Sequence, residues 1–243
     1  MDEPLSPEDE IKRQTLIKLL TLGAFSMAPV SVLEAAWWGR KPQTVSKDKS
    51  IFNLEGDVRV NNQRADLNTR IKAGDKVWTG DDSEAVFVVG GDSFIMRSNS
   101  EMEIAGSSFF LSSLRLISGG LLSVFGKRNN NQRLNMVTST ATIGIRGTGV
   151  YMEAEPDLTY LCTCYGSVEV QSAQDPNDTQ IISTTHHDQP KYISNKKVKG
   201  SAIRKAPFIN HTDPELKMLE ALVGREVPFG LEAELYRGPR RDY

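Results

Sequence analysis

Cysteine and histidine are the residue types in this sequence best suited to chemistry. Cys162 and Cys164 are the two cysteines and stand two positions apart, and the three histidines are His186, His187 and His211. Thiolate and imidazole are ligands that bind zinc and copper, and thiolates can also carry out redox chemistry. Any metal or thiol chemistry involving these residue types must therefore draw on these five residues.

The two cysteines lie in a stretch that is typical of a β-strand. Residues two apart in a strand project on one face, so Cys162 and Cys164 share a face, which we expect to include Val168 and Val170 and to point into the core. Buried cysteines can also serve as small hydrophobic residues. A disulfide between them would require a distorted backbone, because both cysteines lie on one strand.

A hairpin would bring histidines to the cysteines. If residues 179–187 fold back through the loop 173–178, Cys164 lies opposite His186 or His187, and one of these histidines shares the cysteine face. The alternative is that the histidine pair only ends a strand. The sequence thus predicts a zinc or copper site, or a redox site, at Cys162, Cys164 and the pair His186 and His187. One histidine of the pair would be the third ligand, and His211, water or a carboxylate the fourth.

The segments around this site have the pattern of strands. Between residues 51 and 193 the apolar residues form short, often alternating runs separated by Gly, Asn or Asp, which predicts an all-β fold. Such a chain of strands forms a two-sheet β-sandwich or roll, or a β-solenoid. The clearest runs are 58–60, 85–89, 94–96, 102–104, 109–116, 121–125, 134–137, 150–152, 158–164 and 167–171.

A short helix is expected near the C-terminus. Thr212 is a candidate N-cap, Pro214 and Glu215 suit the first turn, and leucines at helical spacing follow before Gly224. We expect its apolar side to dock on the β domain, and binding of a partner protein is the alternative. The remainder of the chain, with Arg237, Arg240 and Arg241, is expected to be an extended basic tail.

Turn motifs follow one another in a recognisable order over residues 51–172: Gly56-Asp57-Val58, residues 73–80, Gly91-Asp92-Ser93, residues 98–102, Ser118-Gly119-Gly120-Leu121, residues 138–148 and residues 166–170. The order of these motifs resembles the FecR domain family. Ser139 and the Gly90-Gly91-Asp92 turn depart from its pattern. The resemblance implies a non-enzymatic protein of the cell envelope that passes a signal from an outer-membrane partner or binds an envelope component.

The N-terminal residues have the pattern of an export signal. Lys12 and Arg13 precede an apolar run, 19–33, which is the layout of a signal peptide, and a retained membrane anchor is the alternative. FecR-like sigma-factor regulators have a cytoplasmic helical segment, whereas only a short acidic stretch precedes Lys12, so we expect a free periplasmic module. The expected divisions are signal peptide or anchor 1–36, linker 37–50, FecR-like domain 51–172, strand extension 173–209, and helix with tail 210–243.

The partners are constrained by charge. The formal net charge is -2 and the basic residues are scattered, which argues against nucleic acid as a partner. The resemblance to the FecR domain implies an envelope protein or glycan as the partner. Arg146 lies between glycines and is a candidate partner contact, unless it pairs internally with a carbonyl or carboxylate. The sequence contains no nucleophile elbow, P-loop or dinucleotide fingerprint, so we expect no enzymatic activity.

Overall fold

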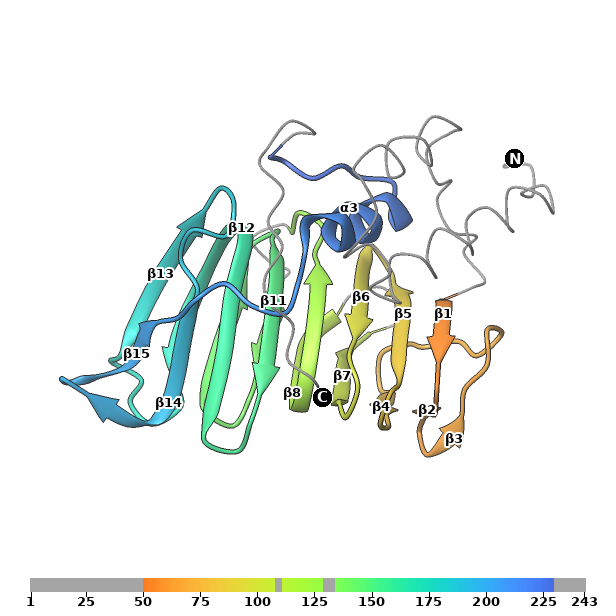
Figure 1. Ribbon diagram of the computed structural model, residues 1–243, viewed down its shortest axis with the longest axis horizontal. Helices are drawn as coiled ribbons and strands as arrows, with labels where there is room; N and C mark the ends of the chain where they lie inside the picture. Colours follow the sequence, from red (N-terminus) through yellow and green to blue (C-terminus); the bar gives the residue numbers. More distant parts are fainter. Residues whose placement is uncertain (1–49, 108–110, 129–133, 230–243) are drawn as a thin grey trace.

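The computed structural model describes residues 50–107, 111–128 and 134–229. Within these ranges the chain forms β-strands followed by one short helix, so the predicted all-β fold with a C-terminal helix is confirmed (Figure 1). The elements are β1 (Ile51–Glu55), β2 (Val58–Val60), β3 (Gln63–Arg64), β4 (Lys76–Thr79), β5 (Glu84–Val89), β6 (Asp92–Met96), β7 (Glu101–Gly106), β8 (Leu111–Val124), β9 (Leu134–Val137), β10 (Ala141–Ile145), β11 (Gly149–Ala154), β12 (Leu158–Ser172), β13 (Thr179–Thr184), β14 (Lys191–Val198), β15 (Ser201–Lys205) and α3 (Asp213–Leu222).

The strands form two layers that share two long strands. Sheet A has the order β1-β5-β6-β8-β11-β12-β14-β15, and sheet B has the order β3-β2-β4-β7-β8-β9-β10-β12-β13. Neighbouring strands are antiparallel except β8 and β9, which are parallel. Because β8 and β12 run through both layers, the fold is a roll in which one layer continues into the other.

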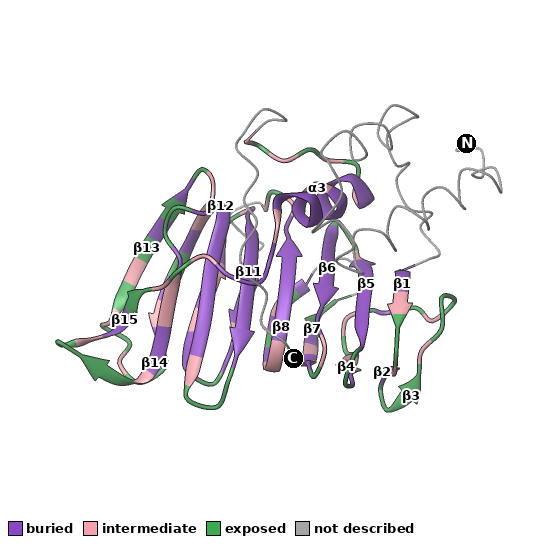
Figure 2. Cartoon of the chain, in the orientation of Figure 1, coloured by how far each residue is buried: buried purple, intermediate pink, exposed green. Residues whose placement is uncertain are grey.

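Sheet A is buried on both of its faces. Along β5, Phe87 belongs to the core between the two sheets, whereas Val86 and Val88 belong to a second apolar cluster on the opposite face. Ile95 of β6 and Leu122 of β8 join this second cluster, which we call the outer cluster. Figure 2 shows the consequence, since the central strands of sheet A are buried along most of their length.

The two shared strands bend at glycines. Gly119 of β8 and Gly166 of β12 have φ angles of 78° and 89°, in the left-handed region that favours glycine. A Cβ at Gly166 would lie 2.6 Å from Thr148 Cγ2, so the site also requires the absence of a side chain. The sequence runs 109–116 and 121–125 predict separate strands, as do 158–164 and 167–171. Both predictions are wrong, because in each case a glycine lets one strand bend between the layers without ending.

The C-terminal segment, defined here as residues 206–224, covers the outer cluster. It contains α3, which begins after the predicted cap: the Thr212 N–H donates to Glu215 Oε2 over 2.9 Å. Leu216, Leu219 and Leu222 are buried in the outer cluster, so the predicted docking of the helix on the β domain is confirmed. In addition, the Ser93 hydroxyl donates to the Leu219 carbonyl oxygen over 2.7 Å.

Some expectations fall outside the described residues. These are the signal peptide or anchor (1–36), nearly all of the linker (37–50), and the basic tail from residue 230 onwards. Among residues 50–107, 111–128 and 134–229, no helix combines the length and the apolar character needed to cross a membrane.

Candidate metal centre

Strand β12 carries both cysteines into the outer cluster. Cys162 and Cys164 are fully buried there, under the C-terminal segment, whereas Val168 and Val170 lie in the core between the sheets. The prediction that all four share one face is therefore wrong. The alternation breaks at Cys164 and Tyr165, which both belong to the outer cluster, and the register with β11 shifts at this point. A bulge of this kind moves later side chains to the opposite face.

The hairpin predicted for the next segment is present. Strand β13 pairs antiparallel with β12 from Gln171↔Thr179 to Gly166↔Thr184. Just beyond β13, the His187 N–H donates to the Cys164 carbonyl oxygen over 3.0 Å. His187 is the histidine on the cysteine side: its Nδ1 lies 3.5 Å from Cys162 Sγ.

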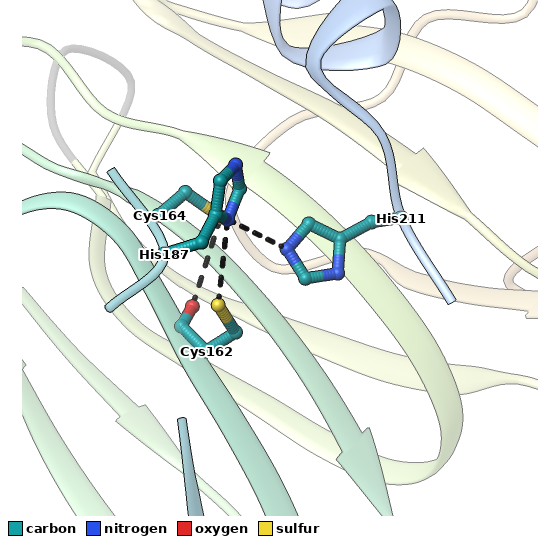
Figure 3. Close-up of side chains that lie close together, drawn as sticks. All are labelled: Cys162, Cys164, His187 and His211. Atoms are coloured by element: carbon teal, nitrogen blue, oxygen red, sulfur yellow. Dashed lines mark hydrogen bonds between the residues drawn. The ribbon is translucent and has the colours of Figure 1, made fainter. Parts of the chain in front are cut away.

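The C-terminal segment supplies a second imidazole. His211 is fully buried, and its Nε2 lies 3.2 Å from Nδ1 of His187. One ligand atom from each of Cys162, Cys164, His187 and His211 lies within 4.8 Å of the other three. Figure 3 shows the four side chains converging from three parts of the chain: strand β12, the loop after β13 that carries His187, and the segment that leads to α3.

The spacing of these atoms suits a tetrahedral ion. With zinc–sulfur bonds of about 2.3 Å and zinc–nitrogen bonds of about 2.05 Å, tetrahedral angles place two nitrogens about 3.4 Å apart and a sulfur about 3.6 Å from a nitrogen. The nitrogen pair of His187 and His211 is 3.2 Å apart, and the Cys162 sulfur is 3.5 Å from the His187 nitrogen. These two distances match tetrahedral zinc coordination, and the remaining distances between the ligand atoms are at most 4.8 Å.

Hydrogen bonds outside the site direct the correct nitrogens inward. His187 Nε2 lies 2.9 Å from Asp213 Oδ1, and His211 Nδ1 lies 2.7 Å from the Ile209 carbonyl oxygen. With a protonated nitrogen at each of these outer contacts, the inner nitrogen of each ring can act as a metal ligand. Metal-binding histidines are commonly oriented in this way by a carboxylate or a backbone carbonyl.

His186 occupies a supporting position. Its Nε2 lies 2.9 Å from Oδ2 and 3.0 Å from Oδ1 of the fully buried Asp213. His186 is therefore not one of the four converging residues, although with His187 and Asp213 it forms a second group of possible ligands. The carboxylate thus receives both histidines of the pair, and it fixes His187 relative to α3, which begins at Asp213.

The two thiols have pKa values shifted in opposite directions. Burial raises the pKa of Cys162, but hydrogen bonding with Cys164 and the charges and hydrogen bonds of His211 and His187 outweigh it, so this pKa lies well below its usual value. Burial and the neighbouring Cys162 raise the pKa of Cys164. Burial lowers the pKa of His187, but hydrogen bonds with Asp213 and Cys162 raise it to about 9. These shifts favour a thiolate on Cys162 beside a cationic His187.

Sequence reasoning missed the acidic and basic residues around the site. Asp213 lies between Thr212 and Pro214 at the start of the predicted helix, and nothing in its spacing indicates a role beside His187. Arg97 was also missed: it is buried between Glu84 and Glu215, with nitrogen–oxygen distances of 2.6 and 2.7 Å. These partners are distant in sequence, so no local pattern could reveal them.

Arg146 lies apart from the cluster. Its side chain is exposed, and its guanidinium lies 3.3 Å from Glu169 Oε2, which is the pairing with a carboxylate that the sequence offered as the alternative to partner contact. Exposed ion pairs of this kind contribute little to stability. Arg146 therefore remains available at the surface.

Comparisons with known proteins give a distant structural likeness. No protein-family profile and no curated protein matches the chain. Two crystal structures of a proposed anti-sigma factor from Parabacteroides distasonis ATCC 8503, at 1.65 and 2.50 Å resolution, each align with a TM-score of 0.43 and 14% sequence identity. Each alignment covers 54% of this chain and 58% of the other protein, so it spans less than two thirds of that protein's length.

Proposed function

We propose that this chain is a non-enzymatic, FecR-like module of the cell envelope that is organised around a buried zinc ion. The observation that carries the zinc assignment is the convergence of two thiols and two imidazoles, with both imidazoles held in ligating orientation from outside. Two cysteines and two histidines are a common ligand set of structural zinc sites, which are tetrahedral and closed. The ligands proposed here are Cys162, Cys164, His187 and His211.

The closure of the site supports a structural rather than a catalytic role. A catalytic zinc keeps one coordination position open to water or substrate, whereas the four side chains proposed here would complete the tetrahedron. The site also contains a chain of contacts typical of a nucleophile, a base and an orienting carboxylate, formed by Cys162, His187 and Asp213. Their solvent exposures are 0%, 2% and 0%, so a substrate cannot reach the Cys162 sulfur in this conformation.

The surface favours the metal over a glycan as the ligand. Sugar-binding faces use exposed aromatic rings to stack against the ligand, because such rings present large apolar surfaces. In the part of the chain that the structure describes, the exposed large hydrophobic residues are Leu67, Ile181 and Val198, none of which is aromatic. The aromatic side chains Tyr151 and Tyr160 are instead buried around the metal ligands.

The assignment to the envelope rests on two features of the sequence. The ordered motifs of residues 51–172 resemble the FecR domain, and two of their glycines, Gly119 and Gly166, stand at the bends of the strands shared by both sheets. The basic and then apolar N-terminal pattern supports export. In an oxidising compartment a bound ion would also protect the two thiols from oxidation. The partner we propose there is an envelope protein that receives or passes a signal.

Elemental analysis tests the metal assignment directly. The full chain is purified without chelator, its zinc and copper contents are measured, and its thiols are titrated before and after chelation. We expect near-stoichiometric zinc and two thiols that react only after the metal is removed. Stoichiometric copper would change the identity of the metal, and metal-free protein that also fails to take up added zinc would refute the proposed site.

Two matched histidine variants sharpen the test. His211→Ala removes a proposed ligand, whereas His186→Ala removes a neighbouring imidazole and leaves the four ligands in place. We expect His211→Ala and Cys162→Ser to lose zinc during gel filtration, and His186→Ala to retain it. Equal retention by all three variants would show that the ion, if present, binds elsewhere.

A further inference from the structure

The four proposed ligands come from two separate parts of the fold. Cys162, Cys164 and His187 belong to the sheets, whereas His211 belongs to the C-terminal segment that covers the outer cluster. We propose that zinc acts as a latch that holds the C-terminal segment on the outer face of sheet A, and that loss of the ion releases the segment. This inference rests on the proposed zinc site and adds a regulated movement to it.

The burial of the site requires such a movement. All four ligand side chains are buried, with exposures of 0–2%, so an ion can enter or leave only when part of the cover opens. His211 and the rings around it are the cover: Phe208 packs against both His187 and His211, with ring centroids 4.6 and 4.5 Å apart. Lifting residues 206–224 exposes the cysteines and removes one ligand in a single step.

The contact between the segment and the sheet is rich in polar groups. Arg97 reaches Glu215 over 2.7 Å, the Tyr160 hydroxyl donates to the Pro207 carbonyl oxygen over 3.0 Å, and the Asn210 amide donates to Glu153. Burying charged groups costs desolvation that their attraction only partly offsets. This polar part of the contact adheres less strongly than an apolar area of the same size, so a metal bond can add to the leucine contacts in holding the segment.

Two residues at the site have an uncommon backbone φ angle. Asn210, which precedes His211, has φ 65°, and His187 itself has φ 56°. Non-glycine residues adopt this left-handed region rarely, and they keep it when the surrounding structure enforces it. Each position lies where the chain brings an imidazole to the site, so coordination would be one of the interactions that hold this backbone, and its loss would favour relaxation of the segment.

Release of the segment would change the surface of the protein. The outer cluster under the segment contains aliphatic and aromatic side chains of sheet A that are now buried, including Ile95, Leu122, Tyr151 and Tyr160. These side chains would become exposed on a continuous face of the sheet. A metal-dependent change in this face is a means by which a binding module can report the state of its site.

Hydrogen exchange on the full chain tests the latch. Exchange is followed by mass spectrometry with zinc bound and after chelation. We expect amides of residues 206–224 to exchange at least tenfold faster without zinc, while amides of sheet B strands such as β4 and β7 change little. Failure to bind zinc would refute the proposed site itself. Stoichiometric zinc binding with equal exchange of residues 206–224 in both states would refute the latch alone.

A second variant tests the same coupling from the opposite direction. Binding free energies are reciprocal, so weakening the docking of the segment must weaken zinc binding. Leu219→Ala removes a buried side chain of α3 that is not a ligand, and Leu67→Ala is its matched control in an exposed loop. We expect at least a tenfold loss of zinc affinity for Leu219→Ala and none for Leu67→Ala. Equal affinities in a folded Leu219→Ala protein would overturn the latch.

Discussion

Replacement of Asp213 by asparagine tests how the site is held in place. The fully buried carboxylate lies 2.9 Å from His187 Nε2, and both of its oxygens contact His186 Nε2. Asparagine has the same shape, but it has one acceptor oxygen instead of two and carries no charge. At least one of these contacts is therefore lost, and the support for the ligating orientation of His187 is weakened.

The expected loss can be estimated from the interaction. A hydrogen bond to a charged group contributes about 1.5–3 kcal/mol, which corresponds to about tenfold to a hundredfold in affinity. Partners that support a metal ligand have effects of the same size when they are removed. We therefore expect Asp213→Asn to bind zinc about ten to a hundred times more weakly than the unaltered chain, without loss of stoichiometry at saturating zinc.

Competition with a chromophoric zinc chelator at fixed pH measures the two affinities. Asp57→Asn is the matched control, because Asp57 is exposed and pairs with Arg59 at the surface. We expect the control to bind zinc like the unaltered chain. If Asp213→Asn also bound zinc with unchanged affinity, the carboxylate would not orient His187, and the argument from the outer hydrogen bonds would fail.

Two further predictions concern stability. Arg97→Met leaves Glu84 and Glu215 buried without their cation, so urea unfolding should show a free energy of unfolding lower by about 3–5 kcal/mol. Arg59→Met at the surface should leave the free energy of unfolding unchanged. Equal stabilities of the two variants would show that Arg97 does not hold a buried ion triad together. Gly166→Ala should lower the free energy of unfolding by about 3 kcal/mol or more, because it adds a close contact to an unfavourable φ angle. Gly200 has a similar φ of 90°, but open space surrounds it, so Gly200→Ala should lower the free energy of unfolding by about 1 kcal/mol. A smaller loss for Gly166→Ala than for Gly200→Ala would show that β12 can bend without a glycine.

Local pattern was sufficient for the parts of the structure that depend on neighbours in sequence. Counting residues outward from the loop 173–178 predicts which histidines meet Cys164, because antiparallel register is determined by the turn. The helix that begins at Asp213 follows from Thr212 and Glu215, whose mutual contact is present in the structure. Both predictions involve residues within one hairpin or one helical turn.

The remaining features depend on contacts between distant segments. The face occupied by Cys162 and Cys164 depends on a bulge opposite Gly149, and alternation within β12 gives no indication of it. The pairing of Arg97 with Glu215 joins residues separated by 118 positions. Periodicity reports how a strand presents its side chains, but it contains no information about which distant charge will lie opposite them.

One signal in the sequence does indicate that the outer face of sheet A is covered. The runs 85–89 and 150–152 are continuously apolar, and strands of this kind are buried on both faces. The amphipathic helix after His211 is a segment with leucines placed to provide the second cover. Because His211 stands two residues before that helix, docking the helix on sheet A also carries an imidazole to the cysteines of β12. Covering the sheet and completing the ligand set are therefore one structural event, which is why zinc and the C-terminal segment should respond to each other.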